Sequence, residues 1–566
     1  MDQKKKRMLI LSAAAVLGVI VCIIGVYIKM FAPSNRVKDL SEYYGVKKNE
    51  VVILMQDRLY ERKAIIEDGI VYVDYETVSS DLNKRFFWDS YENLMLFTTP
   101  TEVIKISAGS KEYTVNKSSK KVDYKIVKVN GDQVYIAMDF IKEYSNIKYK
   151  LYKKPYRLVI QNDFSNEHMY AKAAKNTQIR TGEGIKHPIL QELKKNDELI
   201  YVSDTVRDGF AKVMSKQGVV GYVKIKHLTD SYYKTLKSDY KEPDYTNIKK
   251  NEKINLVWHQ VTYQAANAGI LEKLATTKGV NVISPTWFSV TSEDGSISSL
   301  ANSLYVERAH SAGVEVWALV DDFSKSVDKA KLLTRTSSRE KLVNELIANA
   351  IRYNLDGINV DFEKVPTAAG DAYMEFLREL SVKCRANGIV LSIDNYVPSA
   401  YTKHYDRQEE GIVADYVITM AYDEHYAGSE ESGSVSSISY VKNSLADILK
   451  EVPKEKVIMA LPFYTRLWKE EGSGDNLKIS SEAYSMGNAA QLMSNKKVKL
   501  SWNDEVGQYY GEFSEGNARY RMWLEDEKSY ELKLRAVFSE DIAGVANWKL
   551  GLEKSEIWNV IAKYVK

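Results

Sequence analysis

Polar side chains alternate with apolar ones in the segment 356–363, which runs Asp-Gly-Ile-Asn-Val-Asp-Phe-Glu. The apolar residues are typical of a buried strand. Because successive side chains of a strand point to opposite faces, Asn359, Asp361 and Glu363 share one face. General acid–base catalysis needs acidic side chains in such a setting, so this row is the candidate catalytic centre. Buried ion pairs are the structural alternative, although no inward-facing Lys or Arg is evident on the neighbouring strands.

Eight apolar runs of strand length alternate with helical stretches between residues 251 and 566. The helical stretches include 339–353 and 372–386. Eight strand–helix units in succession predict an α/β domain with a (β/α)8 TIM barrel, whose chemistry sits at the C-terminal ends of the strands. The predicted strands are Ile254–Trp258, Val280–Ser284, Val314–Val320, Gly357–Phe362, Ile389–Ile393, Tyr416–Met420, Val457–Leu461 and Gly544–Trp548. The stretch 465–541 is long for a simple helix and predicts an insertion that contains a small hairpin.

Three further residues fall near the ends of the predicted strands. Trp287 follows the second strand, and Asn395 and Tyr396 follow the fifth. We interpret all three as candidate substrate contacts, because barrel loops carry binding residues at these ends. Packing within the barrel is the alternative role for each of them.

These residues resemble glycoside hydrolase family 18. The segment 356–363 is similar to the family signature D-G-x-D-x-D-x-E, and Met420-Ala421-Tyr422-Asp423 is similar to its M-x-Y-D element. Trp548, at the end of the eighth predicted strand, matches the family's floor tryptophan. The segment 284–288 and the spelling of the signature look most like the branch of spore-cortex and germination-type wall hydrolases. The resemblance covers the barrel and implies cleavage of β-linked N-acetylglucosamine glycans, peptidoglycan before chitin.

The resemblance also implies a retaining mechanism in which the substrate assists. Glu363 would protonate the leaving oxygen, and the 2-acetamido oxygen of the sugar would attack the anomeric carbon to give an oxazolinium ion. Asp361 would hold the acetamido N–H and stabilise the positive charge. Tyr422 would donate to the acetamido oxygen, Asp423 would help to hold that group, and Trp548 would form the floor under the sugar. Met420 belongs to the same binding element.

Position 359 departs from the family signature, because it holds Asn359 where the wider family has Asp. The amide can hydrogen-bond to Asp361 but carries no charge. It is therefore expected to lower the pKa of Asp361 relative to a pair of carboxyl groups. The terminal Glu363 is retained, which argues against the second class of function, a non-catalytic glycan-binding or scaffold protein of the cell wall.

Composition excludes several other functions. Lys and Arg total 79 and Asp and Glu total 76, so the net charge of +3 gives no basic excess for a nucleic-acid partner. The seven His residues contain no H-E-x-x-H motif, and Cys22 and Cys384 cannot form a cysteine cluster. The sequence therefore implies no metal and no cofactor.

The N-terminus predicts a membrane anchor over residues 1–30. Four basic residues, 4–7, precede an uncharged run, Met8–Ile28. That run is roughly 31 Å long as a helix, which is enough to cross a bilayer. The basic cluster places the N-terminus in the cytoplasm and the domains outside. A cleaved signal peptide or a lipoprotein is the alternative; the run is long for the former, and Val21 before Cys22 fits the latter poorly.

Three regions separate the anchor from the barrel. Residues 36–165 read as short strands and turns, with an internal echo between 68–73 and 130–136. They resemble the stalk domain of copper amine oxidases, which implies an α+β spacer without copper chemistry. Residues 170–230 are similar to the bacterial Src-homology-3-like small β barrel, which implies binding to wall peptide or glycan; a packing spacer is the alternative role. Residues 231–250 are polar and read as a linker before the barrel at 251–566.

Overall fold

The computed structural model describes residues 2–565, which form two compact units. The first unit comprises the chain up to Lys84 together with residues 108–112 and 121–242. The second comprises residues 85–107 and 113–120 and the chain from Pro243 onward. All candidate catalytic residues belong to the second unit.

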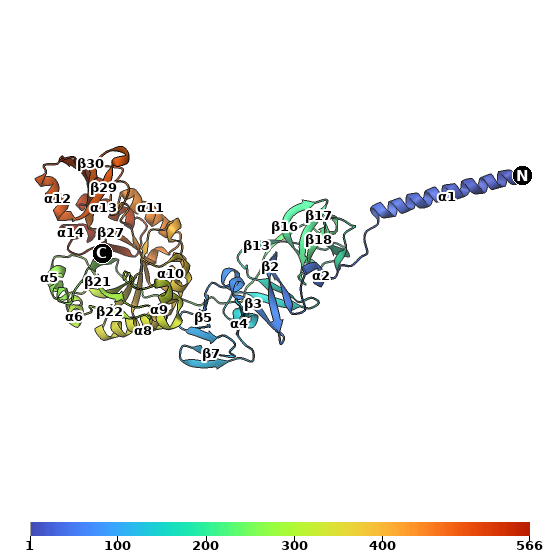
Figure 1. Cartoon of the computed structure of the whole chain (residues 1–566), viewed down its shortest axis with the longest axis horizontal. Helices are drawn as coiled ribbons and strands as arrows, with labels where there is room; N and C mark the ends of the chain where they lie inside the picture. The colour runs from blue at the N-terminus through green and yellow to red at the C-terminus, as the bar shows by residue number, and fades with distance from the viewer. Residues whose placement is uncertain (1, 566) are drawn as a thin grey trace. The chain divides into compact units, whose positions relative to one another are not determined.

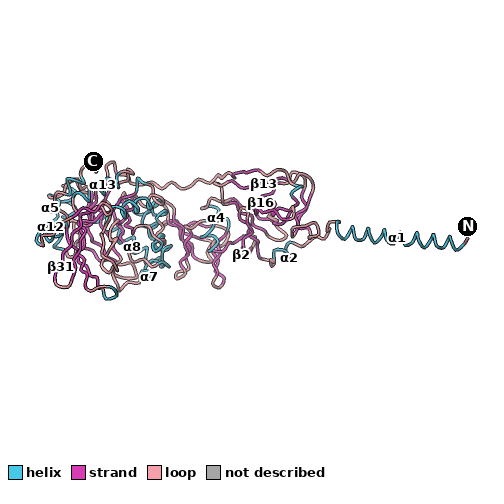
Figure 2. Tube along the Cα trace, turned by 90° about the horizontal axis from the view of Figure 1, so that it is seen from above, coloured by secondary structure: helices cyan, strands magenta, loops and turns pink. Residues whose placement is uncertain are grey.

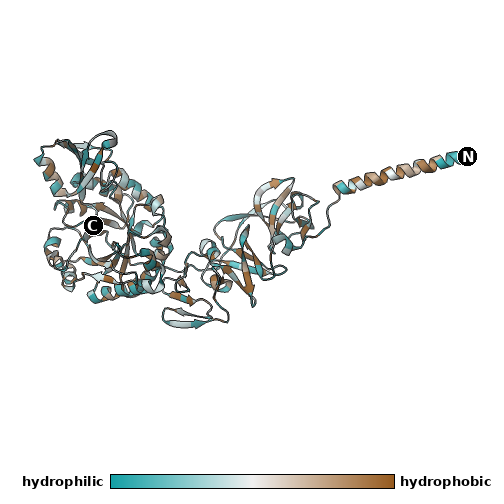
Figure 3. Ribbon diagram, in the orientation of Figure 1, coloured by the Kyte–Doolittle hydropathy of each residue, from teal (hydrophilic) through white to brown (hydrophobic). Residues whose placement is uncertain are grey.

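The N-terminal segment forms one uninterrupted helix, α1 (Gln3–Phe31) (Figure 2). None of the residues of this helix is buried. Figure 3 colours most of its length as hydrophobic. The helix is long and apolar enough to cross a membrane, and it contains the whole run predicted from the sequence. A signal sequence has the same properties, so the helix fits an anchor and a leader alike.

The first unit contains two seven-stranded sheets. One has the strand order β11-β12-β1-β2-β3-β10-β9, and short helices α3 (Tyr75–Thr77) and α4 (Met138–Glu143) follow β3 and β10. The hairpins β2–β3 and β9–β10, each followed by a helix, account for the internal echo, and β3 pairs with β10. The strands are β1 (Glu50–Met55), β2 (Arg58–Glu67), β3 (Ile70–Asp74), β9 (Val127–Asn130), β10 (Gln133–Ala137), β11 (Lys148–Tyr152) and β12 (Arg157–Gln161).

The other sheet has the order β15-β14-β18-β17-β16-β13-β19. Its last strand, β19, begins the segment predicted as a linker and pairs with β13, where the rings of Tyr170 and Tyr232 stack. The irregular connection to the barrel is therefore shorter than predicted and covers residues 236–253. The strands are β13 (Glu167–Lys172), β14 (Thr177–Arg180), β15 (Ile189–Leu193), β16 (Glu198–Arg207), β17 (Phe210–Ser215), β18 (Val220–Lys224) and β19 (Tyr232–Thr235).

The second unit is built on a closed barrel of eight parallel strands (Figure 1). β20 pairs with both β21 and β33, which closes the barrel and confirms the predicted fold class. β22 (Ile297–Ser299) adds an antiparallel edge to β21. The barrel strands are β20 (Ile254–His259), β21 (Val282–Val290), β23 (Glu315–Asp321), β24 (Gly357–Asp361), β25 (Val390–Tyr396), β26 (Tyr416–Met420), β27 (Val457–Pro462) and β33 (Gly544–Trp548).

Helices cover the outside of the barrel, and each strand is apolar on the face toward them. One core lies between helices and strands, and a smaller one fills the barrel around Trp258, Trp317 and Tyr416. The helices are α5 (Ile270–Ala275), α6 (Ser303–Ser311), α7 (Lys329–Thr334), α8 (Thr336–Tyr353), α9 (Gly370–Asn387), α10 (Arg407–Val413), α11 (Ile438–Ile448), α13 (Glu527–Phe538) and α14 (Ile557–Ile561).

The segment 465–541 contains an insertion, which is larger than the single hairpin predicted. A five-stranded antiparallel sheet of order β29-β28-β32-β31-β30 packs against α12 (Met486–Asn495). Its strands are β28 (Tyr464–Glu471), β29 (Lys478–Ser485), β30 (Ser501–Asn503), β31 (Gln508–Glu515) and β32 (Ala518–Leu524).

Residues 85–107 fold with the barrel rather than with the rest of the predicted domain 36–165. Phe87, Leu96 and Val103 join the barrel's hydrophobic core. The burial of these apolar side chains, rather than closeness in the sequence, therefore decides which unit this segment packs with. The strands here are β4 (Phe86–Asp89), β5 (Leu94–Thr98) and β6 (Val103–Ser107), in a sheet continued by β7 (Glu112–Val115) and β8 (Ser118–Lys121).

A buried ion pair network fixes this sheet to the barrel helices. Glu409 on α10 is 1 % exposed, and one of its oxygens accepts from Arg85 Nε at 2.8 Å and from Arg378 Nε at 3.0 Å. Burial raises the pKa of Glu409, but the two guanidinium groups outweigh it and lower that pKa to about 2. The carboxylate therefore stabilises the folded state above its ordinary pKa and loses this contribution as the pH falls toward 2.

Replacement of Glu409 by Gln is expected to lower the free energy of unfolding by about 3–5 kcal/mol, because the buried guanidinium group of Arg378 and the partly buried one of Arg85 lose the negative charge that they share. The change is measured by denaturant unfolding at pH 7, and the loss of stability between about pH 5 and pH 2 should be smaller in the variant. Glu340→Gln is the control: its pair with Lys105 on β6 is more exposed and is worth less than about 1 kcal/mol. Equal losses in both variants would contradict the prediction.

Candidate active site

The barrel brings the acidic residues of neighbouring strands together at one end. On β24, Asn359 and Asp361 face the interior, and Glu363 follows where the strand ends. The parallel register places Asp321 on β23 beside Asp361. Because carboxyl ends of parallel strands meet at one rim, the candidate residues converge on one cavity there.

This cavity has a volume of about 580 Å³. Of the residues proposed from the sequence, seven line it: Asp361, Glu363, Tyr396, Met420, Tyr422, Asp423 and Trp548. A neighbouring cavity of about 530 Å³ shares Phe323, Asp361 and Trp548 with it and is also lined by Trp287. Because they share these residues, the two cavities form one groove across the rim.

Glu363 is held in place by hydrogen bonds from two directions. Its backbone N–H donates to Asp322 Oδ1 at 3.0 Å, and the hydroxyl of Tyr396 donates to Glu363 Oε2. Burial, followed by this hydrogen bond, raises the pKa of Tyr396 well above its ordinary value, so the phenol remains a neutral donor. The half-buried carboxyl group of Glu363 is thus oriented into the cavity with one oxygen already bound.

Replacement of Tyr396 by Phe is expected to lower kcat about 10- to 100-fold, because its hydrogen bond stabilises the carboxylate that forms as Glu363 gives up its proton, and a hydrogen bond to a charged group is worth about 1.5–3 kcal/mol. KM should change little, since the hydroxyl orients Glu363. Steady-state kinetics on the glycan substrate measure both constants. Tyr401→Phe, in the segment that follows β25 and 91 % exposed, is the matched control and should retain full activity. An unchanged kcat in Tyr396→Phe would contradict the role.

Asp361 is buried, and its Oδ1 atom has no hydrogen-bond partner among the described residues. Burial raises the pKa of Asp361 well above its ordinary value, and the neighbouring carboxyl groups of Asp394 and Glu363 raise it further. An unpaired acceptor in the wall of a cavity is suited to an N–H group brought by a ligand.

The sequence suggested that the amide of Asn359 hydrogen-bonds to Asp361 and so lowers its pKa, but the structure gives this amide other partners. Asn359 is fully buried, and its Nδ2 donates to Asp394 Oδ1 at 2.8 Å and to Ser392 Oγ at 3.1 Å. Its Oδ1 accepts from Trp258 Nε1 at 2.9 Å and from Ser284 Oγ at 3.0 Å. The amide therefore lies beneath the cavity, and Asp394 rather than residue 359 supplies the second carboxyl group.

Tyr422 and Trp548 form the opposite part of the cavity. Burial, and then nearby Tyr464 and the acids, raise the pKa of Tyr422 well above its ordinary value, so its hydroxyl is a neutral donor. Trp548 packs over Trp258 with ring centroids 5.8 Å apart. Asp423 accepts a hydrogen bond of 2.6 Å from the hydroxyl of Tyr464, a residue that sequence reasoning missed.

Two candidates lie differently from what the sequence predicted. Asn395 is 1 % exposed and donates to Glu410 on α10, outside the barrel, so it does not line either cavity. Asn395 directly follows the inward-facing Asp394 on β25, so its side chain points to the outer face of the barrel. Trp287 is 1 % exposed, and its indole N–H donates to Asn267 at 2.9 Å. It forms part of the groove wall with its polar edge already bound.

Sequence reasoning missed Asp394, although the signal was present. The alternation that grouped 359, 361 and 363 also places 392, 394 and 396 on the inner face of β25. The exposed rings of Phe323 and Tyr426 also line the groove and carried no sequence signal of their own.

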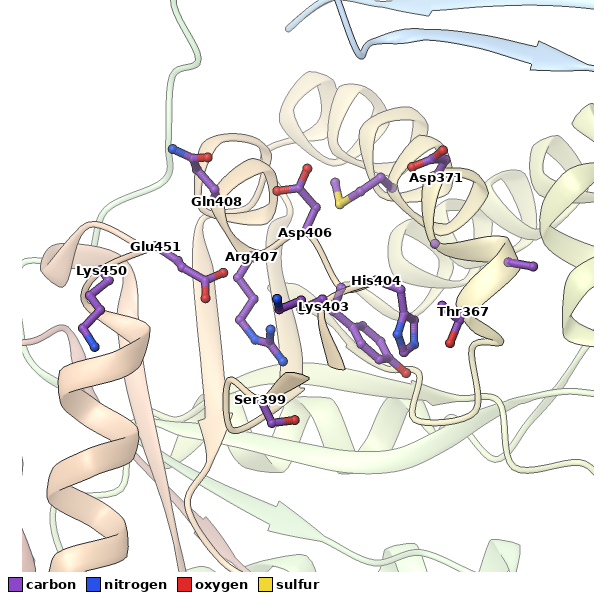
Figure 4. Close-up of a pocket in the computed structure, with 14 residues that line it drawn as sticks. Thr367, Asp371, Ser399, Lys403, His404, Asp406, Arg407, Gln408, Lys450 and Glu451 are labelled. Carbon is purple, nitrogen blue, oxygen red and sulfur yellow. The ribbon is translucent and has the colours of Figure 1, made fainter. Parts of the chain in front are cut away.

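A further cavity, of about 660 Å³, lies beside the starts of α9 and α10 (Figure 4). Its wall mixes basic and acidic side chains, among them Lys403, Arg407 and Glu451. Arg407 donates to the backbone oxygen of Tyr396 at 3.2 Å and to Thr402 Oγ1 at 2.8 Å. We assign a structural role to Arg407 in the wall of this cavity, since its hydrogen bonds hold the end of β25 that carries Tyr396.

Comparison with known proteins agrees with this geometry. Residues 313–553 match the model of glycosyl hydrolases family 18, and residues 54–158 match the N-terminal domain of copper amine oxidases. The chain is 27 % identical over 288 residues to the uncharacterized glycosylase YvbX of Bacillus subtilis, which covers 48 % of this chain and 82 % of that protein.

A second relative is the cortical fragment-lytic enzyme of Bacillus subtilis, 24 % identical over 238 residues, or 41 % of this chain and 54 % of that protein. The chain thus spans little more than half the length of this relative. The crystal structure of the Bacillus cereus spore cortex-lytic enzyme SleL has a TM-score of 0.50 at 19 % identity, over 56 % of this chain and 76 % of that one. This likeness shows the barrel fold.

Proposed function

Because the chain carries a glycoside hydrolase family 18 domain, we propose that it is a membrane-anchored, extracellular hydrolase of β-linked N-acetylglucosamine glycans, foremost peptidoglycan. The observation that carries the proposal is the shared cavity of Glu363, Asp361, Tyr422 and Trp548, together with the buried Asp361 oxygen that has no hydrogen-bond partner among the described residues. The retaining, substrate-assisted mechanism is part of the proposal and is taken from the likeness to glycoside hydrolase family 18.

The two acids stand on the same strand face, about 6.6 Å apart along the strand. A protein nucleophile would have to approach the sugar from the side opposite the acid. Asp361 stands beside Glu363 on the same strand, and we propose, from the likeness to the family, that the substrate supplies the nucleophile. An N-acetyl sugar carries one in its 2-acetamido group.

In the first step Glu363 gives its proton to the glycosidic oxygen, and the bond from that oxygen to the anomeric carbon breaks. The acetamido oxygen forms a bond to the same carbon, which leaves an oxazolinium ion with one positive charge. Asp361 accepts the acetamido N–H and faces that charge. Tyr422 donates to the acetamido oxygen and orients it for attack.

In the second step a water molecule attacks the anomeric carbon, and Glu363 takes its proton. The ring of the oxazolinium ion opens and restores the acetamido group. Two inversions at one carbon give net retention of configuration. The rings of Trp548 and Phe323 offer apolar faces against which the sugar lies during both steps.

Three observations support peptidoglycan over chitin. A relative is named for the lysis of cortical fragments. The N-terminal helix α1 is preceded by the basic residues 4–7, which favours a cytoplasmic N-terminus and domains outside the membrane. The two seven-stranded sheets stand between α1 and the barrel in the order of the chain, with the segment 170–230 as the proposed wall-binding module.

The proposal is tested by mass spectrometry of products after incubation of the detergent-solubilised full-length protein with purified peptidoglycan. New fragments with reducing N-acetylglucosamine ends are expected. Cleavage of chitin oligomers alone would move the substrate to chitin. Binding to both polymers without cleavage of either would make the protein a glycan-binding or scaffold protein. Recovery of the full-length chain in the soluble rather than the membrane fraction would contradict the anchor.

A further inference from the structure

Asp394 is a buried acid for which the mechanism above has no role. It is 2 % exposed and lines the catalytic cavity. The parallel register pairs Val360 of β24 with Ile393 of β25. The residues that follow them, Asp361 and Asp394, therefore lie side by side on the two strands. Adjacent strands lie about 4.8 Å apart, and both side chains point into the barrel.

The surroundings of this pair are acidic. The groups that act on Asp361 are Asp394 on β25, Glu363 on β24, and Asp321 and Asp322 on β23. Those that act on Asp394 are the amide of Asn359 and the carboxyl group of Glu363. Tyr396 on β25 and Tyr422 on β26 are neutral, and the basic group of the cavity lining is the exposed Lys364 at the rim.

Two neighbouring carboxyl groups in a dry site cannot both be ionised, because their repulsion adds to the loss of hydration. One proton is therefore shared between them. Asn359 decides where the remaining negative charge rests in the free enzyme, since its Nδ2 donates to Asp394 and leaves Asp361 Oδ1 without a donor.

We propose that Asp394 is a positioning residue that exchanges the shared proton with Asp361. In the free enzyme the proton rests on Asp361 and the negative charge on Asp394. As the acetamido oxygen attacks the anomeric carbon and positive charge develops on the acetamido group, the proton moves from Asp361 to Asp394, and Asp361 becomes the carboxylate that faces the oxazolinium ion. The total charge of the pair stays at −1, so no proton enters or leaves the site.

This exchange gives Asp361 its charge in the transition state rather than beforehand. An interaction that strengthens only on the way to the transition state raises kcat, whereas one present throughout does not. The carboxyl group that the family signature places at 359 stands here on the next strand, and the amide of Asn359 connects the two positions.

The test compares Asp394→Asn with the exchanged pair Asn359→Asp/Asp394→Asn in the full-length protein. The inference rests on the proposed hydrolase activity. In Asp394→Asn the new amide oxygen still accepts from Asn359, so packing and hydrogen bonds are preserved. We expect kcat to fall about 10- to 100-fold with no rise in KM.

The pH profile supplies a readout that a purely structural role would not move. Removal of the Asp394 charge lowers the pKa of Asp361, so the carboxylate persists to lower pH and the acidic limb of kcat/KM shifts to lower pH. The exchanged pair restores one carboxyl group beside Asp361, now at position 359 instead of 394. The amide at position 394 then donates the hydrogen bond that the amide at position 359 donates in the original protein. It is expected to recover kcat to within about 5-fold of the original protein and to restore the acidic limb.

Ser392→Ala is the matched control, because it removes another hydrogen bond of Asn359 without removing a carboxyl group. It should change kcat less than 3-fold. An unchanged pH profile and kcat in Asp394→Asn would overturn the inference, and so would an exchanged pair that melts like the original protein but recovers nothing. Inactivity of the original protein on every glycan would instead refute the proposed function.

Discussion

Replacement of Glu363 by Gln is expected to lower kcat on the glycan about 10²–10⁴-fold, the usual contribution of a positioned general acid. The amide keeps the size of the side chain and still accepts the hydrogen bond from Tyr396. It has no proton to give to the leaving oxygen and cannot take one from water. The measurement is the initial rate of product release at saturating glycan, together with calorimetric binding of an N-acetylglucosamine oligomer, which should be retained.

The same substitution elsewhere on the barrel provides the control. Glu307 on α6 is exposed on the outer face, so Glu307→Gln should have the kcat of the original protein. A Glu363→Gln variant that keeps more than a tenth of the original kcat would exclude Glu363 as the general acid.

Replacement of Asp361 by Asn is expected to lower kcat about 10²–10³-fold, which is the range for loss of one preorganised electrostatic contact to a developing charge. The amide can still contact the acetamido group but carries no negative charge toward the oxazolinium ion. The surrounding acids cannot replace it, because Asp321 is bound by Ser289 at 2.7 Å and Asp322 by the backbone after β24.

An aryl glycoside separates the two roles. A phenolate of low pKa leaves without a general acid, so Glu363→Gln should release the aryl group at a rate much closer to that of the original protein than on the natural glycan. Asp361→Asn should be impaired to a similar degree on both substrates, because the oxazolinium ion forms with either leaving group. Equal recovery of both variants on the aryl glycoside would contradict this division of roles.

In residues 85–107, the local sequence pattern is not sufficient to predict which unit of the protein a segment packs with. Residues 85–107 form short strands with alternating apolar and polar residues, like the segments on either side of them. This pattern does not predict which hydrophobic core the strands will join. Phe87, Leu96 and Val103 pack with the barrel because its helices present a complementary apolar surface. The charge of Glu409, which holds Arg85 there, lies more than 300 positions along the chain, a separation at which sequence spacing carries no information.

The sequence by itself determined the barrel and the identity of the catalytic row. The eight apolar runs that alternate with helical stretches, and the alternation of Asn359, Asp361 and Glu363 along one strand, follow from periodicities that hold for any isolated strand or helix. All eight predicted strands are present, and their pairing closes the barrel as expected.

Only the tertiary structure decided what surrounds each member of that row. Asp394 became the neighbour of Asp361 through the register between β24 and β25, and Tyr396 became the donor to Glu363 through the same pairing. Alternation assigns side chains to a face of their own strand, whereas register sets which residues of two strands stand level. The register depends on how all eight strands close into one barrel, so no single segment contains it.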